Sequence, residues 1–303
     1  MMHTCTELFN LDNNTLYTQT NMRLIKMAGG LGNQMFIYAM YLSMHKRFGE
    51  NVRIDITDLL HLHPHNGYEL HDVFRLPPCE FRVNRLLKKI LEGTLFRIIL
   101  ERHQHGSMKA YHEPICWPWI YYKGFYQNER YFADVEQEVR QAFTFSTEKA
   151  SHQSRLLMQH LHTDPYAVSI HVRRGDYVSP RYWQSMGQYT SKTYFLSAIE
   201  RMRALVPQAH FYVFSDDISW VQQNLPLSDA TFVDWNVGKD SWQDMMLMSA
   251  CHHHIISNST FSWWGAWLNP CTDKLVIAPL QWDSSHMASE IIPPSWITVN
   301  NLP

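Results

Sequence analysis

The sequence has few of the features that mark secreted, membrane-spanning or nucleic-acid-binding proteins. Its five cysteines lie far apart and form no Cys-x-x-Cys pair, which is typical of reduced thiols inside a cell. No apolar run approaches the roughly 20 residues that a membrane span needs, and residues 1–21 lack the basic and apolar regions of a signal peptide. We therefore expect a cytoplasmic protein with at most peripheral association at the inner face of a membrane.

Charge of one sign and metal-binding patterns are also scarce. Lys and Arg total 26 against 28 Asp and Glu, so no nucleic-acid partner is expected. The chain has no Asp-x-Asp pattern, which commonly holds a metal–nucleotide pair. Histidines gather at 61–65 and 252–254, but the first group falls in a polar region and the second leads into a strand, where alternate side chains face opposite sides. We expect no metal ion and no cofactor.

What the sequence does contain is two series of alternating strands and helices. Apolar residues make up 45% of the chain, enough for a packed core. The alternation predicts an α/β fold of two Rossmann-like domains facing a central cleft. The expected parts are a polar extension (1–21), an N-terminal domain (22–155) and a C-terminal domain (156–303). The expected strands lie at 23–28, 51–56, 166–172, 210–215, 253–257 and 274–279, and the expected helices at 33–49, 191–207, 241–251 and 258–268.

Two adjacent arginines, Arg173 and Arg174, follow the strand-like run 166–172 in "HVRRGD". Like charges repel, and burying them unpaired costs several kcal/mol. The carboxyl ends of strands in open α/β sheets are where ligands bind, and a guanidinium suits a pair of phosphate oxygens. An anionic ligand is therefore expected there. The alternative is a structural ion pair in which Asp176 neutralises one of the arginines.

Two further strand ends carry polar residues. Asn258, Ser259 and Thr260 are typical helix N-cap residues, and a helix N-terminus can bind an anion, although an ordinary cap would look the same. Asp216 and Asp217 follow the strand 210–215. Their carboxylates can accept the paired N–H donors of a guanine, or they can simply belong to a turn.

The segment "GGLGNQ" only loosely resembles a dinucleotide-binding fingerprint. Gly30 and Gly32 fit the pattern, but the third glycine is missing. The amides of Asn33 and Gln34 can bind sugar hydroxyls or phosphates, and Asp55 lies about where a ribose-binding acid is expected. The alternative is that the glycines only permit a tight turn.

Together these motifs resemble the α-1,2-fucosyltransferases of glycosyltransferase family 11, and in particular their bacterial branch. The resemblance covers nearly everything from residue 22 onward. It implies a GT-B fold and transfer of L-fucose from GDP-fucose to the 2-hydroxyl of a galactose-terminated oligosaccharide, with inversion and without a metal ion. The matching segments, in order, are "GGLGNQMFIYA", "KGFYQNERYF", "HVRRGDY", "FSDD", "DMMLMSACHHHIISNSTFSWWGAWLN" and "IIPPSWI".

The resemblance also implies roles for residues of the second half, which would carry the donor site. Arg173 resembles the residue that grips the β-phosphate, and Asp217 resembles a carboxylate that recognises guanine. The phosphate-contacting turn would be formed by Thr260, Phe261 and Ser262.

The general base stays open, with His171, Asp176 and an acidic residue of the first half as candidates. The linkage of the acceptor galactose also stays open. Two other function classes remain as alternatives. One is a nicotinamide-dependent oxidoreductase that uses the "GGLG" turn, and the other is a carbohydrate-binding protein without catalysis.

Overall fold

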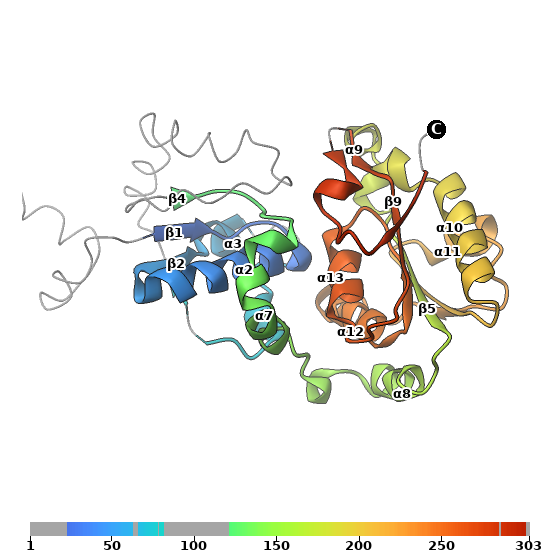
Figure 1. Cartoon of the computed structure of the whole chain (residues 1–303), viewed down its shortest axis with the longest axis horizontal. Helices are drawn as coiled ribbons and strands as arrows, with labels where there is room; N and C mark the ends of the chain where they lie inside the picture. Colours follow the sequence, from blue (N-terminus) through green and yellow to red (C-terminus); the bar gives the residue numbers. More distant parts are fainter. Residues whose placement is uncertain (1–22, 63–65, 78, 82–120, 285, 301–303) are drawn as a thin grey trace, which may run out of the picture. The chain divides into compact units, whose positions relative to one another are not determined.

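The chain divides into two compact units, one ending at Ala142 and the other beginning at Phe143 (Figure 1). The computed structural model describes residues 23–62, 66–77, 79–81, 121–284 and 286–300. The polar extension predicted at 1–21 lies outside the described residues.

The N-terminal unit contains a parallel four-stranded sheet in the order β3-β2-β1-β4. Helix α2 connects β1 to β2, so the predicted β-α-β unit is present. The helix is buried on most of its sides and ends at Gly49, whose φ of 58° favours glycine. The elements of this unit are β1 (Arg23–Lys26), α2 (Leu31–Phe48), β2 (Val52–Asp55), α3 (Thr57–Leu62), α4 (Leu70–Val73), β3 (Glu80–Phe81), β4 (Tyr121–Tyr122) and α7 (Glu136–Ala142).

The C-terminal unit contains a parallel six-stranded sheet in the order β12-β9-β8-β5-β6-β7. The chain builds β5, β6 and β7 outward in one direction and then returns to place β8 on the other side of β5. This is the Rossmann strand order, and its switch point lies between β5 and β8. The strands are β5 (Ala167–Val172), β6 (His210–Ser215), β7 (Thr231–Val233), β8 (His253–Ile255), β9 (Val276–Pro279) and β12 (Ile297–Val299).

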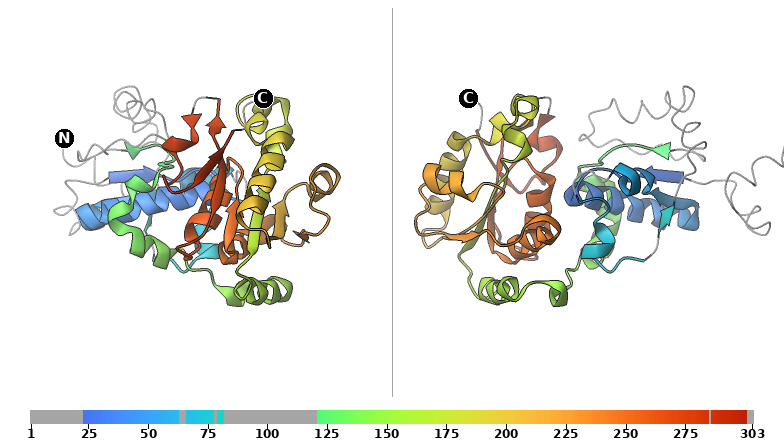
Figure 2. Two further views of the ribbon diagram at one scale, coloured as in Figure 1. Left: turned by 45° about the vertical axis from the view of Figure 1, so that its right-hand side comes forward. Right: turned by 180° about the vertical axis from the view of Figure 1, so that it is seen from behind.

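Helices cover both faces of this sheet. Figures 1 and 2 show α10 and α11 on one face and α12 and α13 on the other. Alternate residues of β5 and β6 pack with the apolar side of α10 in one core, as the period of two in a strand requires. The remaining elements are α8 (His152–Leu161), α9 (Pro180–Trp183), α10 (Lys192–Leu205), α11 (Ile218–Asn224), α12 (Trp242–Ala250), α13 (Thr260–Leu268) and an antiparallel pair, β10 (Gln281–Asp283) with β11 (His286–Met287).

The boundary between the units falls earlier in the chain than the expected position after residue 155. The Phe143 ring lies edge-on to Trp264 of α13, with 5.2 Å between ring centroids. The backbone N–H of Ser151 donates to Gln243 Oε1 of α12 at 2.8 Å. Residues 143–155 therefore pack with the C-terminal unit, because their partners lie on helices about a hundred residues further along.

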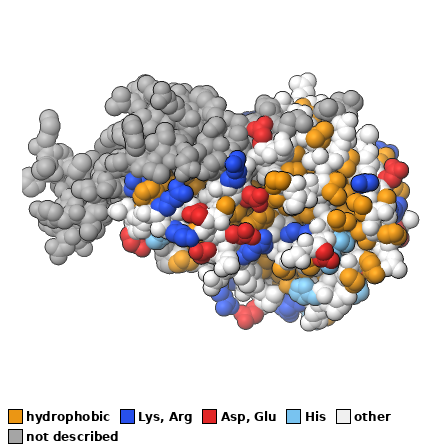
Figure 3. Space-filling view, viewed as in Figure 1, with side chains coloured by type: hydrophobic (Ala, Val, Ile, Leu, Met, Phe, Trp, Pro, Cys, Tyr) orange, Lys and Arg blue, Asp and Glu red, His pale blue; other side chains and the backbone are white. Residues whose placement is uncertain are grey.

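Acidic and basic side chains are interspersed on the described residues of the face that Figure 3 shows, in keeping with the near-neutral composition. Within the described ranges, no helix is both long enough and apolar enough to cross a membrane.

Candidate functional site

The switch point brings the arginine motif and the "SNST" turn into direct contact. The hydroxyl of Ser257, which follows β8, donates to the carbonyl oxygen of His171 at 2.6 Å. The same hydroxyl accepts the backbone N–H of Arg173 at 3.1 Å. Ser257 is fully buried. One side chain thus joins the ends of the two central strands. The sequence did not single it out, because its partners lie 84 and 86 residues away.

Helix α13 begins at the end of this turn without a side-chain cap. Ser259 is the N-cap residue in extended conformation, but its side chain makes no capping hydrogen bond, and the first turn contains no acidic residue. The first intrahelical bond of the turn runs from the N–H of Trp263 to the carbonyl of Ser259. The N–H groups of Thr260, Phe261 and Ser262 therefore form an uncapped, electropositive helix end beside β5.

Arg173 is paired with carboxylates. Its Nε and Nη2 lie 3.1 and 2.9 Å from Asp176 Oδ1, and Nε lies 3.7 Å from Asp216 Oδ2. Burial alone would lower the pKa of Arg173, but the two carboxylates outweigh it and raise the pKa above its ordinary value. In the chain without a ligand, Arg173 thus forms the ion pair with Asp176 that the sequence offered as the alternative to an anionic ligand. Because the side chain of Asp176 is 41% exposed, an anionic ligand can replace it without entering the core.

Arg174 lies on the other side of the same loop. Its Nε is 3.0 Å from Asp217 Oδ2, and its guanidinium carbon lies 4.0 Å from the centroid of the Trp220 ring. Its backbone N–H donates to Asp216 Oδ1 at 2.7 Å. This contact is possible because a Cβ on Gly175 would lie 2.6 Å from the other oxygen of Asp216.

Asp217 is engaged through both oxygens. Oδ1 accepts the N–H of Trp220 at 3.0 Å and caps α11, while Oδ2 holds Arg174. Because the cap and the ion pair use the carboxylate, a guanine would have to displace one of them. The described geometry gives Asp217 a structural role, and the guanine contact implied by the resemblance stays a prediction.

His171 is buried and neutral. Its ring lies 5.6 Å from that of Phe261, and its Nδ1 has no hydrogen-bond partner among the described residues. Burial, helped by the charge of Arg173, lowers the pKa of His171 to about 3. A base with so low a pKa takes up a proton poorly near neutral pH. His171 is therefore better suited to accept a hydrogen bond than to act as the general base.

Two residues of the expected phosphate-binding turn, Asn258 and Ser262, have side chains that form hydrogen bonds within the protein. The amide of Asn258 is buried; its Nδ2 donates to the carbonyls of Met186 and Trp282, and its Oδ1 accepts the hydroxyl of Thr190. The hydroxyl of Ser262 points back to the carbonyl of Ser259 at 3.2 Å. The side chains of Asn258 and Ser262 are thus already hydrogen-bonded within the chain, and the ligand contacts expected of these two residues stay predictions.

The "GGLG" turn of the N-terminal unit has its positive φ at the first of its glycines. Gly29 has a φ of +77°, and a Cβ there would lie 2.6 Å from Asn33 Nδ2. The glycine that the turn requires is thus Gly29, while Gly30 is the N-cap of α2 and Gly32 is buried in its first turn. Asn33 accepts the amide of Gln127 at 2.7 Å through Oδ1.

Gln34 and Asp55 are structural residues. The fully buried Gln34 donates through Nε2 to the carbonyls of Gly29 and Gly67, and its Oε1 accepts the N–H of Glu69. The amide of Gln34 is therefore engaged within the protein, and the ligand role expected for it stays a prediction. The Asp55 carboxylate, also buried, accepts the hydroxyls of Thr57 and Tyr121. It has no oxygen directed to solvent for a ribose, which removes a main support of the oxidoreductase alternative.

The histidine segment 252–254 has partners within the protein. His252 lies 3.0 Å from Asp273, and His253 accepts the N–H of Leu275. His254 is buried between Ser169 and Asn269, each 2.8 Å from a ring nitrogen. Of the other histidine segment, residues 63–65 lie outside the described residues.

Asp244, near the start of α12, is an unusual carboxyl group that the sequence reasoning missed. Burial raises its pKa to about 7, although the hydrogen bond from Asn236 Nδ2, at 2.8 Å, acts in the opposite direction. Nothing in the local sequence distinguishes it from an ordinary helix-surface aspartate.

Comparison with known proteins places these features in a family context. The pattern of glycosyl transferase family 11 matches residues 3–300. An alpha-1,2-colitosyltransferase of Escherichia coli is 32% identical, over 90% of this chain and 97% of its own length. The O-antigen biosynthesis glycosyltransferase WbnK of E. coli is 27% identical, over 90% and 99%. The human galactoside alpha-(1,2)-fucosyltransferase 1 is 27% identical, over 90% and 73%.

Among solved structures, the fucosyltransferase NodZ from Bradyrhizobium is similar with a TM-score of 0.52 and 15% identity, over 82% of this chain and 94% of NodZ. NodZ co-crystallised with GDP has a TM-score of 0.51. Together with the two parallel-sheet units, this likeness confirms the predicted α/β, GT-B fold.

Proposed function

The chain belongs to glycosyl transferase family 11, and we propose that it transfers L-fucose from GDP-fucose to the 2-hydroxyl of a terminal β-galactoside, with inversion and without a metal ion. Its relatives include an alpha-1,2-colitosyltransferase and a galactoside alpha-(1,2)-fucosyltransferase. Family membership also favours a transferase over an oxidoreductase or a non-catalytic carbohydrate-binding protein.

One observation carries the proposal. The hydroxyl of Ser257 fixes the Arg173 backbone against the turn that leads into the uncapped end of α13. A guanidinium and several backbone N–H groups are thereby held at the switch point of the sheet, where nucleotides bind in this topology. The pyrophosphate of a nucleotide sugar supplies the charge that matches these donors.

The same donors support the chemistry. When the bond between fucose and GDP breaks, negative charge develops on the β-phosphate and the sugar becomes oxocarbenium-like. Prearranged donors in a site that excludes water stabilise such charge far better than water does. We assign this stabilisation to Arg173 and to the N–H groups of Thr260, Phe261 and Ser262. In the proposed complex the β-phosphate replaces Asp176 as the partner of Arg173.

Colitosyl transfer is a second candidate, favoured by the 32% identity with the E. coli colitosyltransferase. Colitose is L-fucose without its 3-hydroxyl group. A site that hydrogen-bonds this hydroxyl rejects the analogue that lacks it, whereas an apolar site accepts both. Comparing GDP-fucose with GDP-colitose as the donor substrate therefore distinguishes the two candidate functions.

The test is to incubate the protein with GDP-fucose or GDP-colitose and a panel of β1,3- and β1,4-linked galactosides, with and without a chelator. Mass spectrometry and linkage analysis of the products identify the donor, the acceptor and the new bond. We expect an α-1,2-linked fucose whose yield the chelator does not change. Transfer of colitose alone would favour the second candidate, and transfer to neither linkage would contradict the proposal.

A further inference from the structure

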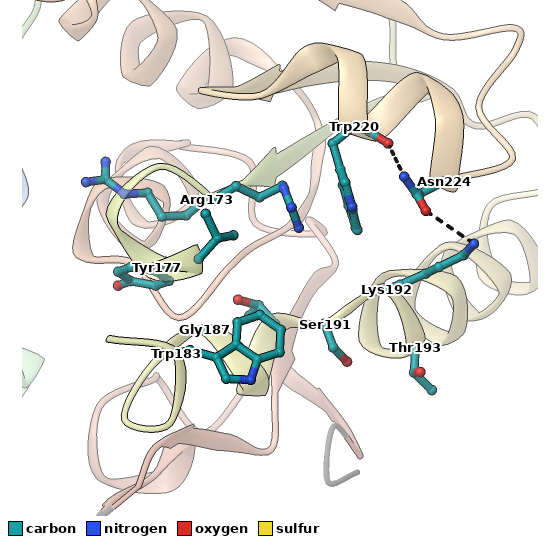
Figure 4. Close-up of a pocket in the computed structure, with 12 residues that line it drawn as sticks. Arg173, Tyr177, Trp183, Gly187, Ser191, Lys192, Thr193, Trp220 and Asn224 are labelled. Atoms are coloured by element: carbon teal, nitrogen blue, oxygen red, sulfur yellow. Dashed lines mark hydrogen bonds between the residues drawn. The ribbon is translucent and has the colours of Figure 1, made fainter. Parts of the chain in front are cut away.

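A cavity of about 450 Å³ lies beside the arginine loop, at the ends of β5 and β6 (Figure 4). Its volume is within the usual range of small-molecule sites, about 300–1,000 Å³. The walls come from the loop after β5, the start of α10 and one side of α11. The residues that matter for its chemistry are Arg173, Arg174, Trp183, Lys192, Trp220 and Asn224.

Every charged side chain that lines the cavity is a cation. Arg173 and Arg174 are partly neutralised by Asp176 and Asp217. Lys192 differs from them, because its Nζ donates only to the neutral Asn224 Oδ1, at 3.4 Å, and no carboxylate among the described residues lies within ion-pair distance of it. The first turn of α10 contains no acidic residue, so its dipole adds to the positive potential. The cavity therefore favours an anion.

Two indole rings border the same cavity. Figure 4 shows Trp220 extending from α11 on one side and Trp183 on the opposite side. Trp183 is 42% exposed, which is high for so large an apolar side chain. Trp220 already carries the Arg174 guanidinium over its ring, so Trp183 offers the exposed aromatic surface. An exposed aromatic face next to convergent polar groups is typical of sites that bind a ring with one apolar face and several polar substituents. A sugar ring has this chemistry.

We propose that this cavity binds an acidic sugar of the acceptor, a residue that carries a carboxylate or a phosphate next to the galactose that receives fucose. This inference rests on the proposed function, since Arg173 borders both the cavity and the proposed phosphate position. Lys192 pairs with the anion, and the exposed ring of Trp183 contacts a face of the sugar, while Trp220 borders the cavity with Arg174 on its ring. The enzyme therefore prefers an anionic acceptor over its neutral counterpart.

The test compares three matched oligosaccharides that end in β-galactose: one with glucuronic acid next to the galactose, one with a glucose phosphate monoester there, and one with glucose. Binding to the full chain is measured by NMR without any donor, and kcat/KM is measured with GDP-fucose. The variants are Lys192→Gln, which keeps a donor for Asn224, Trp183→Ala, and the control Lys239→Gln, which removes an exposed lysine of the same unit.

We expect the better of the two charged oligosaccharides to bind about three- to tenfold more tightly than the neutral one, and to lose that preference at high salt. Which of the two binds better identifies carboxylate or phosphate as the source. Lys192→Gln should bring the ratio of charged to neutral affinity close to one, whereas Lys239→Gln should keep it. Trp183→Ala should weaken all three ligands.

Equal affinity of the wild-type protein for charged and neutral sugars would overturn the inference. So would a Lys192→Gln variant whose affinity for GDP falls as much as its affinity for the charged sugar, since the cavity would then belong to the donor. Because binding is measured without GDP-fucose, the two proposals can fail separately. If fucose is transferred but Lys192→Gln leaves the ratio of charged to neutral affinity unchanged, only this inference is refuted. If no fucose is transferred but Lys192→Gln still lowers that ratio, only the proposed function is refuted.

Discussion

The two units contain the same local arrangement, a strand that ends in a turn and leads into a helix without a side-chain cap, but they use their polar side chains differently. In the N-terminal unit, Gln34 and Asp55 are buried and engaged with backbone and side chains of that unit. In the C-terminal unit, Arg173 pairs with the half-exposed carboxylate of Asp176, which a ligand can replace. The strand-turn-helix geometry alone therefore does not make a site; replaceable charge at the turn does.

The largest effect that would test this contrast is expected at Arg173. Arg173→Ala should lower kcat/KM by about 10²–10³, the usual cost of removing one donor to a developing negative charge. Arg173→Lys should not restore activity, because a lysine lacks the planar fork of donors. The measurement is steady-state transfer from GDP-fucose.

The matched control is Arg140→Ala, which breaks the exposed Arg140–Glu136 pair of the N-terminal unit. It should leave kcat/KM within about twofold, because exposed pairs contribute about 0–1 kcal/mol to stability. Near wild-type turnover by Arg173→Lys would show that the bidentate contact is not needed.

The next largest effect is expected on stability, from Gln34→Ala. The change leaves the N–H of Glu69 and two carbonyls without their partner, and each buried unsatisfied group costs roughly 1–3 kcal/mol. Urea unfolding should show a clear loss of stability. The affinity of the folded fraction for GDP, measured by calorimetry, should not change. A selective loss of GDP affinity with normal stability would restore Gln34 as a ligand residue.

A smaller effect is expected at the hydroxyl that joins β5 and β8. Ser257→Ala leaves the N–H of Arg173 without its acceptor, and we expect GDP to bind about tenfold more weakly, equivalent to about 1.4 kcal/mol. Ser259→Ala, two residues further on, is the control, because that hydroxyl makes no capping bond. Equal effects of the two substitutions in calorimetry would contradict the special role of Ser257.

The remaining prediction concerns the pH dependence of stability at Asp244. Its pKa is raised from an ordinary 3.8 to about 7 in the folded state, so between those values the folded chain binds more protons than the unfolded chain. This group therefore lowers stability as pH rises from about 4 to 7. Asp244→Asn should melt at a higher temperature than the wild type at pH 8 and at the same temperature near pH 4. A difference that does not vary with pH would contradict the raised pKa.

Much of the fold follows from the sequence, because hydrophobic period and strand ends are local properties. The strand predicted at 210–215 is present with those bounds as β6, and the helix predicted at 258–268 is present as α13 from Thr260. The edge strands β7 and β12, of three residues each, were not predicted. Short edge strands have too few residues to show a period and form only when a neighbouring strand is in place.

The site could be predicted as motifs but not as contacts. The motifs at the ends of β5, β6 and β8 were identified from the sequence, although Ser257 was not singled out. Their roles changed where a partner distant in sequence occupies the side chain. Asn258 binds Met186 and Trp282, and Asp217 both caps α11 and holds Arg174. Ser257 gained a role for the same reason. Local sequence does not report which distant backbone groups will need a hydrogen bond.

By itself, the sequence determined the alternation of strands and helices, the family pattern, and the concentration of charge after the strand 166–172, because each depends on residues near one another in the chain. Only the tertiary structure decided which of the polar side chains are hydrogen-bonded within the protein and which can contact a ligand. The strand order sets β8 beside β5, and that one adjacency lets Ser257 reach His171 and Arg173. The physical reason is that a hydrogen bond depends on distance in space, and the fold determines that distance.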